Sequence, residues 1–131
     1  MVTIKVGLVG CGAIGQAILR AADQNSIPGV SIIGVSSRTR DSADKFLKSL
    51  TSDIPWTHTD SLIQQADLIV EAAGPEVVAG LAEDVFRAGK NLMVISVGAL
   101  IARPDLIDKS RVSGSRLIIP SGAIVGLDGI K

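Results

Sequence analysis

The stretch GLVGCGAIGQAILRAA, residues 7–22, decides the fold. An aliphatic run typical of a buried strand ends at Gly10, and apolar residues resume with helical spacing from Ala13. Three glycines at this corner fit the pattern G-x-G-x-x-G. The first glycine makes a tight turn, the second lets a diphosphate approach the backbone, and the third packs the helix closely on the sheet. Because backbone amides and the helix dipole favour a negative ligand here, the pattern predicts a dinucleotide site.

Strand and helix patterns alternate along the rest of the chain. Besides the strand at 3–9 and the helix at 13–22, the sequence predicts strands at 30–36, 56–58, 68–72, 92–97 and 116–119. Helices are expected from Asp41 as a cap, from Pro75, and from Pro104. Such alternation favours right-handed crossovers between parallel strands. We therefore predict an α/β fold, a doubly wound (Rossmann), mostly parallel sheet of about six strands with helices on both faces.

Composition narrows the function further. The 131 residues carry 13 basic and 13 acidic side chains, and only 2% of them are aromatic. This balance predicts neither a nucleic-acid partner nor a membrane surface. The single cysteine, Cys11, excludes an internal disulfide and is typical of a reducing, cytoplasmic protein.

The end of the second strand predicts which dinucleotide binds. An NAD site usually has Asp or Glu there, about 20 residues after the glycines, to accept hydrogen bonds from the ribose hydroxyls. This chain has SSRTR at 36–40 and no carboxylate before Asp41. Two guanidinium groups, of Arg38 and Arg40, and neighbouring hydroxyls suit a 2′-phosphate. The cofactor is NADP or NAD, with NADP favoured; the alternative is an ordinary solvated loop.

No catalytic or metal-binding set can be assembled from the sequence. His58 is the only histidine, and a solvated side chain is the favoured interpretation. Cys11 needs no role beyond packing, and Glu71 at the end of a strand could orient a ligand or simply be solvated. Since hydride transfer from an amino or hydroxy acid needs a positioned proton acceptor, the chain is predicted to be the cofactor half of an enzyme. The candidate cofactor-binding residues are Gly10, Gly12, Ala13, Ile14, Gly15, Ser37, Arg38, Thr39, Ala73, Gly74 and Ser96.

Three stretches together resemble the N-terminal part of the L-aspartate dehydrogenase family. They are GLVGCGAIG at 7–15, VEAAGPEVV at 70–78 with VISVGAL at 94–100, and IIPSGAIVGLDGIK at 118–131. The resemblance implies that the full enzyme oxidises L-aspartate to iminosuccinate with NAD or NADP. The imine then hydrolyses to oxaloacetate and ammonia, or enters NAD biosynthesis.

The same resemblance adds Ala123 to the candidate cofactor contacts and implies a division of the chain. Residues 1–120 would form the dinucleotide-binding domain. Residues 121–131 would begin the connection to a second, catalytic domain that carries the family's histidine and is absent from this chain. On its own, the chain would then bind cofactor without turnover.

Three alternatives stay open or are disfavoured. The sugar-oxidoreductase type of Rossmann protein usually has Glu-Lys-Pro after the fifth strand. This chain has Ser96-Val97-Gly98 there, so this alternative is disfavoured. A homoserine-dehydrogenase-like enzyme is compatible with the predicted fold, but the last motif, PSGAIVGLD, resembles that family less well. A free-standing dinucleotide sensor or regulatory subunit is the alternative outside enzymes. A domain cut from its neighbour can also expose an apolar surface, so a homo-oligomer stays open.

Overall fold

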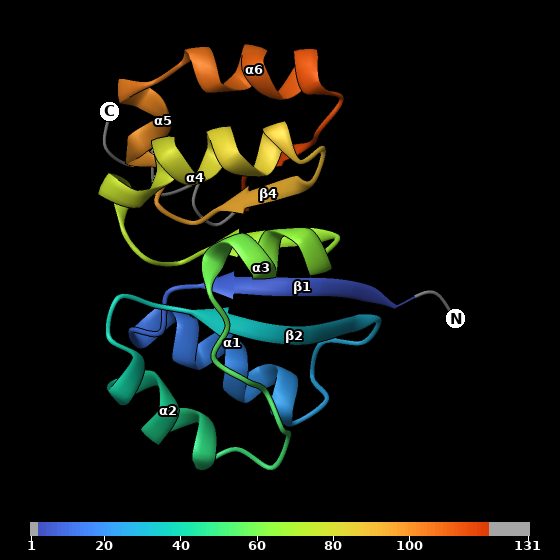
Figure 1. Cartoon of the computed structure of the whole chain (residues 1–131), viewed down its shortest axis with the longest axis vertical. Coiled ribbons are helices and arrows are strands. Elements are labelled where there is room, and N and C mark those ends of the chain that lie inside the picture. The colour runs from blue at the N-terminus through green and yellow to red at the C-terminus, as the bar shows by residue number, and fades with distance from the viewer. Residues whose placement is uncertain (1–2, 121–131) are drawn as a thin grey trace.

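A computed structural model describes residues 3–120, which form one parallel sheet with helices on both faces (Figure 1). The strand order across the sheet is β2-β1-β3-β4-β5. In chain order the elements are β1 (Ile4–Val9), α1 (Ala13–Asp23), β2 (Val30–Ser36), α2 (Arg40–Lys48), α3 (Thr59–Gln65), β3 (Leu68–Glu71), α4 (Pro75–Arg87), β4 (Asn91–Val94), α5 (Gly98–Ala102), α6 (Asp105–Ser113) and β5 (Leu117–Ile118).

Side-chain alternation along the strands divides the core into two layers. Leu8 packs with Leu19 of α1 and Leu47 of α2 on one face of the sheet. Its neighbour Val9 packs on the opposite face, in the cluster that contains Val78 of α4. Successive strand residues point to opposite faces, so the continuous aliphatic runs of these strands are buried on both sides. Figure 1 shows α1 and α2 at one end of the molecule and α4, α5 and α6 at the other.

The winding order creates a crevice between two neighbouring strands. From β1 the chain passes outward to β2, and it then returns past β1 to form β3 on the other side. The strands are in register at their carboxyl ends, where Val9 pairs with Ser36 on one side and with Glu71 on the other. In open α/β sheets a ligand binds at such a reversal, outside the carboxyl ends of the strands. The topology therefore places the expected site beside the glycine corner.

The fold class is confirmed, with two corrections to the strands. The described residues form five strands rather than about six, because the segment predicted as a strand at 56–58 makes one isolated bridge, from Trp56 to Val35. The chain turns at His58 directly into α3, which leaves no length for a ladder. The strand predicted at 92–97 ends at Val94. The Ile95 amide still donates to the Glu71 backbone carbonyl, but the Ser96 amide donates to the Glu71 side chain instead of continuing the ladder.

Helix ends also differ from the prediction. Asp41 lies in the first turn of α2, whose cap is Thr39, and its charge there still complements the helix dipole. The short helix α5 had no clear signal in the sequence. Among residues 3–120, none of the helices has the length and apolar character that a membrane span requires.

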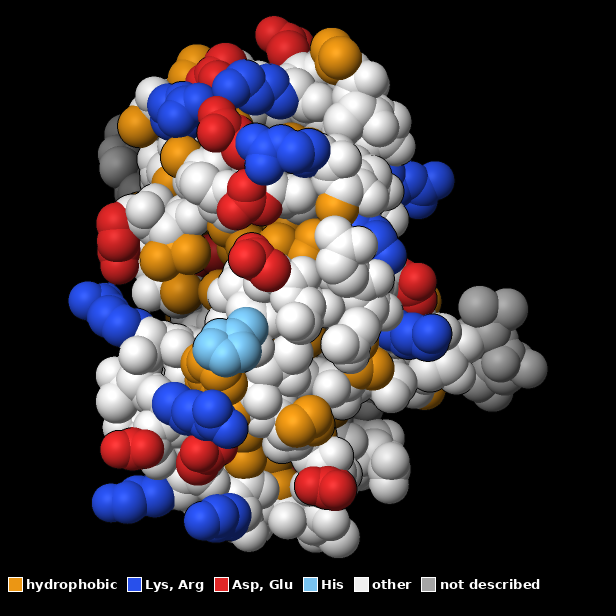
Figure 2. Space-filling model, in the orientation of Figure 1, with side chains coloured by type: hydrophobic (Ala, Val, Ile, Leu, Met, Phe, Trp, Pro, Cys, Tyr) orange, Lys and Arg blue, Asp and Glu red, His pale blue; other side chains and the backbone are white. Residues whose placement is uncertain are grey.

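Ion pairs join α6 to α4 at the end of the molecule away from β2. Lys109 contacts the carboxylate of Glu83 on α4 at 2.8 Å, and Arg103 contacts it at 3.5 Å. Arg103 also contacts the carboxylate of Asp105, at the start of α6, at 2.9 Å. The hydrogen bond from Arg103 lowers the pKa of Asp105 to about 2. Figure 2 shows acidic and basic side chains interleaved at this end rather than segregated by sign.

Candidate functional site

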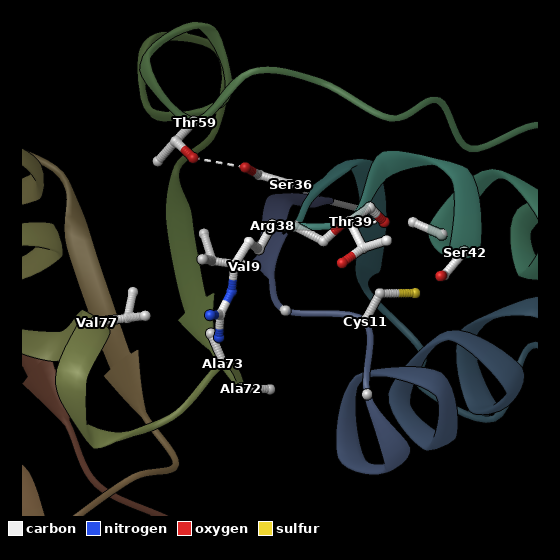
Figure 3. A pocket seen from close by; sticks show the side chains of 14 residues that line it. Val9, Cys11, Ser36, Arg38, Thr39, Ser42, Thr59, Ala72, Ala73 and Val77 are labelled. Carbon is white, nitrogen blue, oxygen red and sulfur yellow. Dashed lines mark hydrogen bonds between the residues drawn. The ribbon is translucent and has the colours of Figure 1, made fainter.

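A cavity of about 510 Å³ lies where the topology predicts, at the carboxyl ends of β1, β2 and β3. Its walls are the loop after β1, the loop after β2 with the start of α2, and the loop after β3 (Figure 3). Six of the residues predicted from the sequence to bind the cofactor line this cavity together: Gly10, Gly12, Ser37, Arg38, Thr39 and Ala73.

Close packing explains why the first and third glycines of the corner carry no side chain. Gly10 has a φ of +111°, and a Cβ there would lie 2.4 Å from the carbonyl oxygen of Ala72. A Cβ on Gly15 would lie 2.3 Å from the carbonyl oxygen of Gly10. These contacts hold the strand, the turn and α1 against the loop after β3. A Cβ on Gly12, in contrast, would meet nothing within 4 Å, because Gly12 faces the open cavity.

The start of α1 presents backbone amides to that space. Gly12 is the N-cap of α1, and no side chain caps its amides. Ala13 and Ile14 form the first turn and are exposed, with Ile14 at 52% of its full accessibility. A helix N-terminus of this kind, reached through a glycine turn, suits a diphosphate.

The end of β2 forms the second wall, and a tryptophan orders it. The indole Nε1–H of Trp56 donates to Ser37 Oγ at 3.1 Å, and Ser37 Oγ donates to the carbonyl oxygen of Thr39 at 3.2 Å. In Figure 3 Arg38 extends from this loop toward Ala73, and Thr39 lies nearer Cys11 and Ser42. Hydroxyls and one guanidinium thus line the cavity at the end of β2. Their contact with the adenosine ribose stays a prediction.

Arg40 does not take the place expected for it. Its guanidinium stacks over the Trp56 ring, 4.7 Å from the ring centroid, and lies 3.6 Å from the carboxylate of Asp44. Arg40 also does not line the cavity. The prediction that two guanidinium groups face the ribose is therefore wrong, because a cation–π contact and an ion pair hold Arg40 outside the cavity.

The burial of Glu71 is the feature that the sequence did not predict. Its side chain is fully buried, rather than solvated or turned toward a ligand, and it accepts hydrogen bonds from the loops after β3 and β4. Gly74 and Ser96, which the sequence predicts as cofactor contacts, are among the donors to Glu71. The one available signal was a carboxylate inside the aliphatic run at 68–72.

The remaining candidates have limited roles in this geometry. His58 is exposed and contacts the Trp56 ring edge-on at 4.8 Å. Cys11 is half-buried, and burial raises the pKa of its thiol, which disfavours the nucleophilic thiolate. Within residues 3–120 no group of three His, Cys, Asp or Glu side chains could hold a metal ion. Ala123 and the segment 121–131 lie outside the described residues.

The glycine corner, the switch in strand order and the cavity between them define a dinucleotide-binding Rossmann domain. A family model for the NAD-binding domain of homoserine dehydrogenase matches residues 10–120. The chain belongs to this family, and its cofactor is NAD or NADP.

Known proteins with similar sequences are L-aspartate dehydrogenases. L-aspartate dehydrogenase 3 of Bordetella bronchiseptica is 35% identical over 127 residues, which are 97% of this chain and 47% of the relative. L-aspartate dehydrogenase of Methanothermobacter thermautotrophicus is 36% identical over 134 residues, covering 100% of this chain and 51% of the relative. The chain thus spans about half the length of the curated relatives it matches.

Solved structures confirm the fold. A homoserine dehydrogenase from Thiobacillus denitrificans superposes with a TM-score of 0.75 at 20% identity, over 89% of this chain and 29% of that chain. Biliverdin reductase from Synechocystis superposes with a TM-score of 0.72 at 22% identity, over 88% and 37% of the two chains. At these identities the likeness concerns the fold alone.

Proposed function

We propose that this chain is the cofactor-binding part of an NADP-preferring oxidoreductase that acts on L-aspartate. The observation that carries the proposal is similarity along nearly the whole chain to L-aspartate dehydrogenases, at 32–36% identity. The cavity at the carboxyl edge of the sheet supports it, because two of the segments that resemble this family, 7–15 and 70–78, contribute to its walls.

The chain's own residues would hold the cofactor in three places. Amides at the start of α1, from Gly12 onward, face the diphosphate, where they and the helix dipole stabilise its charge. Ser37, Arg38 and Thr39 face the adenosine ribose. Ala73 and the neighbouring Gly74 carry the nicotinamide half, over the second part of the sheet.

The preference for NADP rests on charge at the end of β2. Arg38 is exposed and lines the cavity, where its guanidinium can form charge-assisted hydrogen bonds with a 2′-phosphate. Asp41, the first carboxylate after β2, lies in the first turn of α2 and does not line the cavity. A ribose 2′-hydroxyl would therefore lack an acidic acceptor there.

The reaction proposed for the whole enzyme is hydride transfer. When bound, the cofactor would supply the hydride acceptor for Cα of L-aspartate. Loss of the hydride and of an amine proton gives iminosuccinate, which water converts to oxaloacetate and ammonia. In this chain the cavity residues bind and orient the cofactor. We assign the groups that accept the proton and clamp the substrate carboxylates to the part of the relatives' length that this chain does not span.

A homoserine-dehydrogenase-like activity is the second candidate, because the matching family model describes the NAD-binding domain of that enzyme. The full-length gene product separates the two: L-aspartate, and not L-homoserine, should drive NADPH formation. For the 131-residue chain, calorimetry should find NADP+ bound more tightly than NAD+, without aspartate-dependent NADPH formation. Equal affinities would refute the NADP preference. Turnover by the 131-residue chain alone would refute the proposal that it binds the cofactor without carrying the catalytic groups.

A further inference from the structure

The buried carboxylate of Glu71 gathers two loops at the carboxyl edge of the sheet. Its Oε2 accepts hydrogen bonds from the amides of Ala73 and Gly74, both at 2.9 Å, and from Ser96 Oγ at 2.8 Å. Its Oε1 accepts from the amides of Ile95 at 3.2 Å and Ser96 at 2.9 Å. Five donors from the loops after β3 and β4 thus converge on one side chain that has no exposed surface.

We propose that Glu71 is a positioning residue for the nicotinamide half of the cofactor. This inference rests on the proposed function and concerns one half of the same site. In a doubly wound sheet, the two strand pairs on either side of the switch point bind the two halves of a dinucleotide. The half beside β2 takes adenosine, and the loops held by Glu71 lie beside the other half, after β3 and β4.

Only a carboxylate suits this place. Both oxygens of Glu71 receive N–H or O–H donors, so a Gln side chain would direct its own N–H groups at donors and leave partly buried amides without this acceptor. Its hydrogen bonds come from backbone amides and one hydroxyl, which fix loop geometry rather than pair one charge with another. A side chain with every partner inside the protein and no exposed surface holds the site; it does not touch the ligand.

The loop after β3 transmits this position to the cavity. Ala72 donates its amide to the carbonyl oxygen of Val9 at 2.8 Å, and its own carbonyl lies against Gly10. Ala72 and Ala73 both line the cavity. A shift of this loop therefore moves the wall on which the nicotinamide half rests.

The adenosine end is held by different contacts. Trp56 orders Ser37 from the loop before α3, and Ser36 Oγ shares a hydrogen bond with Thr59 Oγ1. Neither contact involves Glu71 or its donors. Loss of the Glu71 carboxylate should consequently affect the two halves of the cofactor unequally.

Titration calorimetry with a whole dinucleotide and with its adenosine half tests the inference. The whole dinucleotide is NADP+ or NAD+, whichever the unmodified chain binds more tightly. The adenosine half is 2′,5′-ADP for NADP+ and ADP for NAD+. For Glu71→Gln we expect dinucleotide affinity to fall about tenfold, while affinity for the half stays within about twofold of the unmodified chain. Glu83→Gln, the same chemical change far from the cavity on α4, should alter neither affinity.

Each other result overturns a specific statement. Equal losses for both ligands would mean that Glu71 supports the whole domain rather than one half of the site, and unchanged binding of both would remove its role. If the unmodified chain binds neither ligand, the proposed function itself fails. Should Glu71→Gln not fold, Ser96→Ala removes one donor and keeps the carboxylate. It should weaken the dinucleotide about threefold and leave the half unchanged; equal effects on both would again overturn the inference.

Discussion

The backbone of Gly10 passes so close to Ala72 that a methyl group on Gly10 would lie 2.4 Å from the Ala72 carbonyl oxygen. The same glycine has a φ of +111°, which a side chain makes unfavourable. The turn of the glycine corner and the loop after β3 are therefore packed as one unit. This unit lines the cavity on both sides of the switch point in strand order.

Gly10→Ala should accordingly destabilise the domain. The strained backbone alone is expected to cost about 1–3 kcal/mol, and the contact with Ala72 adds to it. Chemical denaturation followed by circular dichroism measures the change in the free energy of unfolding. A variant as stable as the unmodified chain would show that the loop after β3 can move away freely.

Gly12→Ala separates ligand access from stability. An added methyl group meets no protein atom there, so the free energy of unfolding should change by less than about 1 kcal/mol. The methyl group would instead occupy the space where the diphosphate approaches the start of α1, and dinucleotide affinity should fall at least about tenfold. Denaturation and calorimetry on the Gly10 and Gly12 variants compare the loss of stability at Gly10 with the loss of affinity at Gly12. If the diphosphate binds elsewhere, Gly12→Ala should leave the affinity unchanged.

The local pattern of the sequence is sufficient for the elements that propensity and glycine spacing control. The strand at Val30–Ser36 and the start of the helix at Ala13 agree with the prediction to the residue. The reason is physical: aliphatic β-branched residues fill a strand buried on both sides, and a glycine turn starts the helix.

Contacts between distant residues explain what the sequence did not reveal. The strand at Asn91–Val94 is shorter than its aliphatic pattern because the Ser96 amide donates to the side chain of Glu71, more than 20 residues earlier. Arg40 leaves the cavity because Trp56, from another loop, provides a ring to stack on. Neither partner is identifiable from spacing along the chain.

The two arginines at the end of β2 offer a matched test of cofactor preference. Arg38→Ala should remove most of the advantage of NADP+ over NAD+, about 1.5–3 kcal/mol for a charge-assisted hydrogen bond. Arg40→Ala removes the same charge from a side chain held on Trp56, and it should leave most of the preference in place. Competitive calorimetry with both cofactors gives the ratio. A larger effect at Arg40 would contradict the assignment.

Trp56 is the only tryptophan of the chain, and its hydrogen bond to Ser37 connects it to the cavity. Its fluorescence should therefore change when NADP+ is added, with a midpoint equal to the calorimetric dissociation constant. Trp56→Phe keeps a ring beneath Arg40 but loses the indole N–H. Because one hydrogen bond contributes about 0.5–1.5 kcal/mol, NADP+ affinity should weaken by that amount or less. An emission spectrum indifferent to NADP+ would argue against an adenosine site at this loop.

Acid should weaken the ion pair between Arg103 and Asp105 at the start of α6. Hydrogen bonding to Arg103 lowers the pKa of Asp105 from 3.8 to about 2, so the folded state favours the carboxylate more than the unfolded chain does. This contribution is complete above pH 3.8 and disappears as the pH falls toward 2. Asp105→Asn should thus show a smaller loss of stability over that interval, measured as denaturation midpoints at several pH values. Asp108→Asn, a control whose side chain is 81% exposed, should follow the unmodified chain; an Asp105 variant that does the same would exclude this ion pair from acid unfolding.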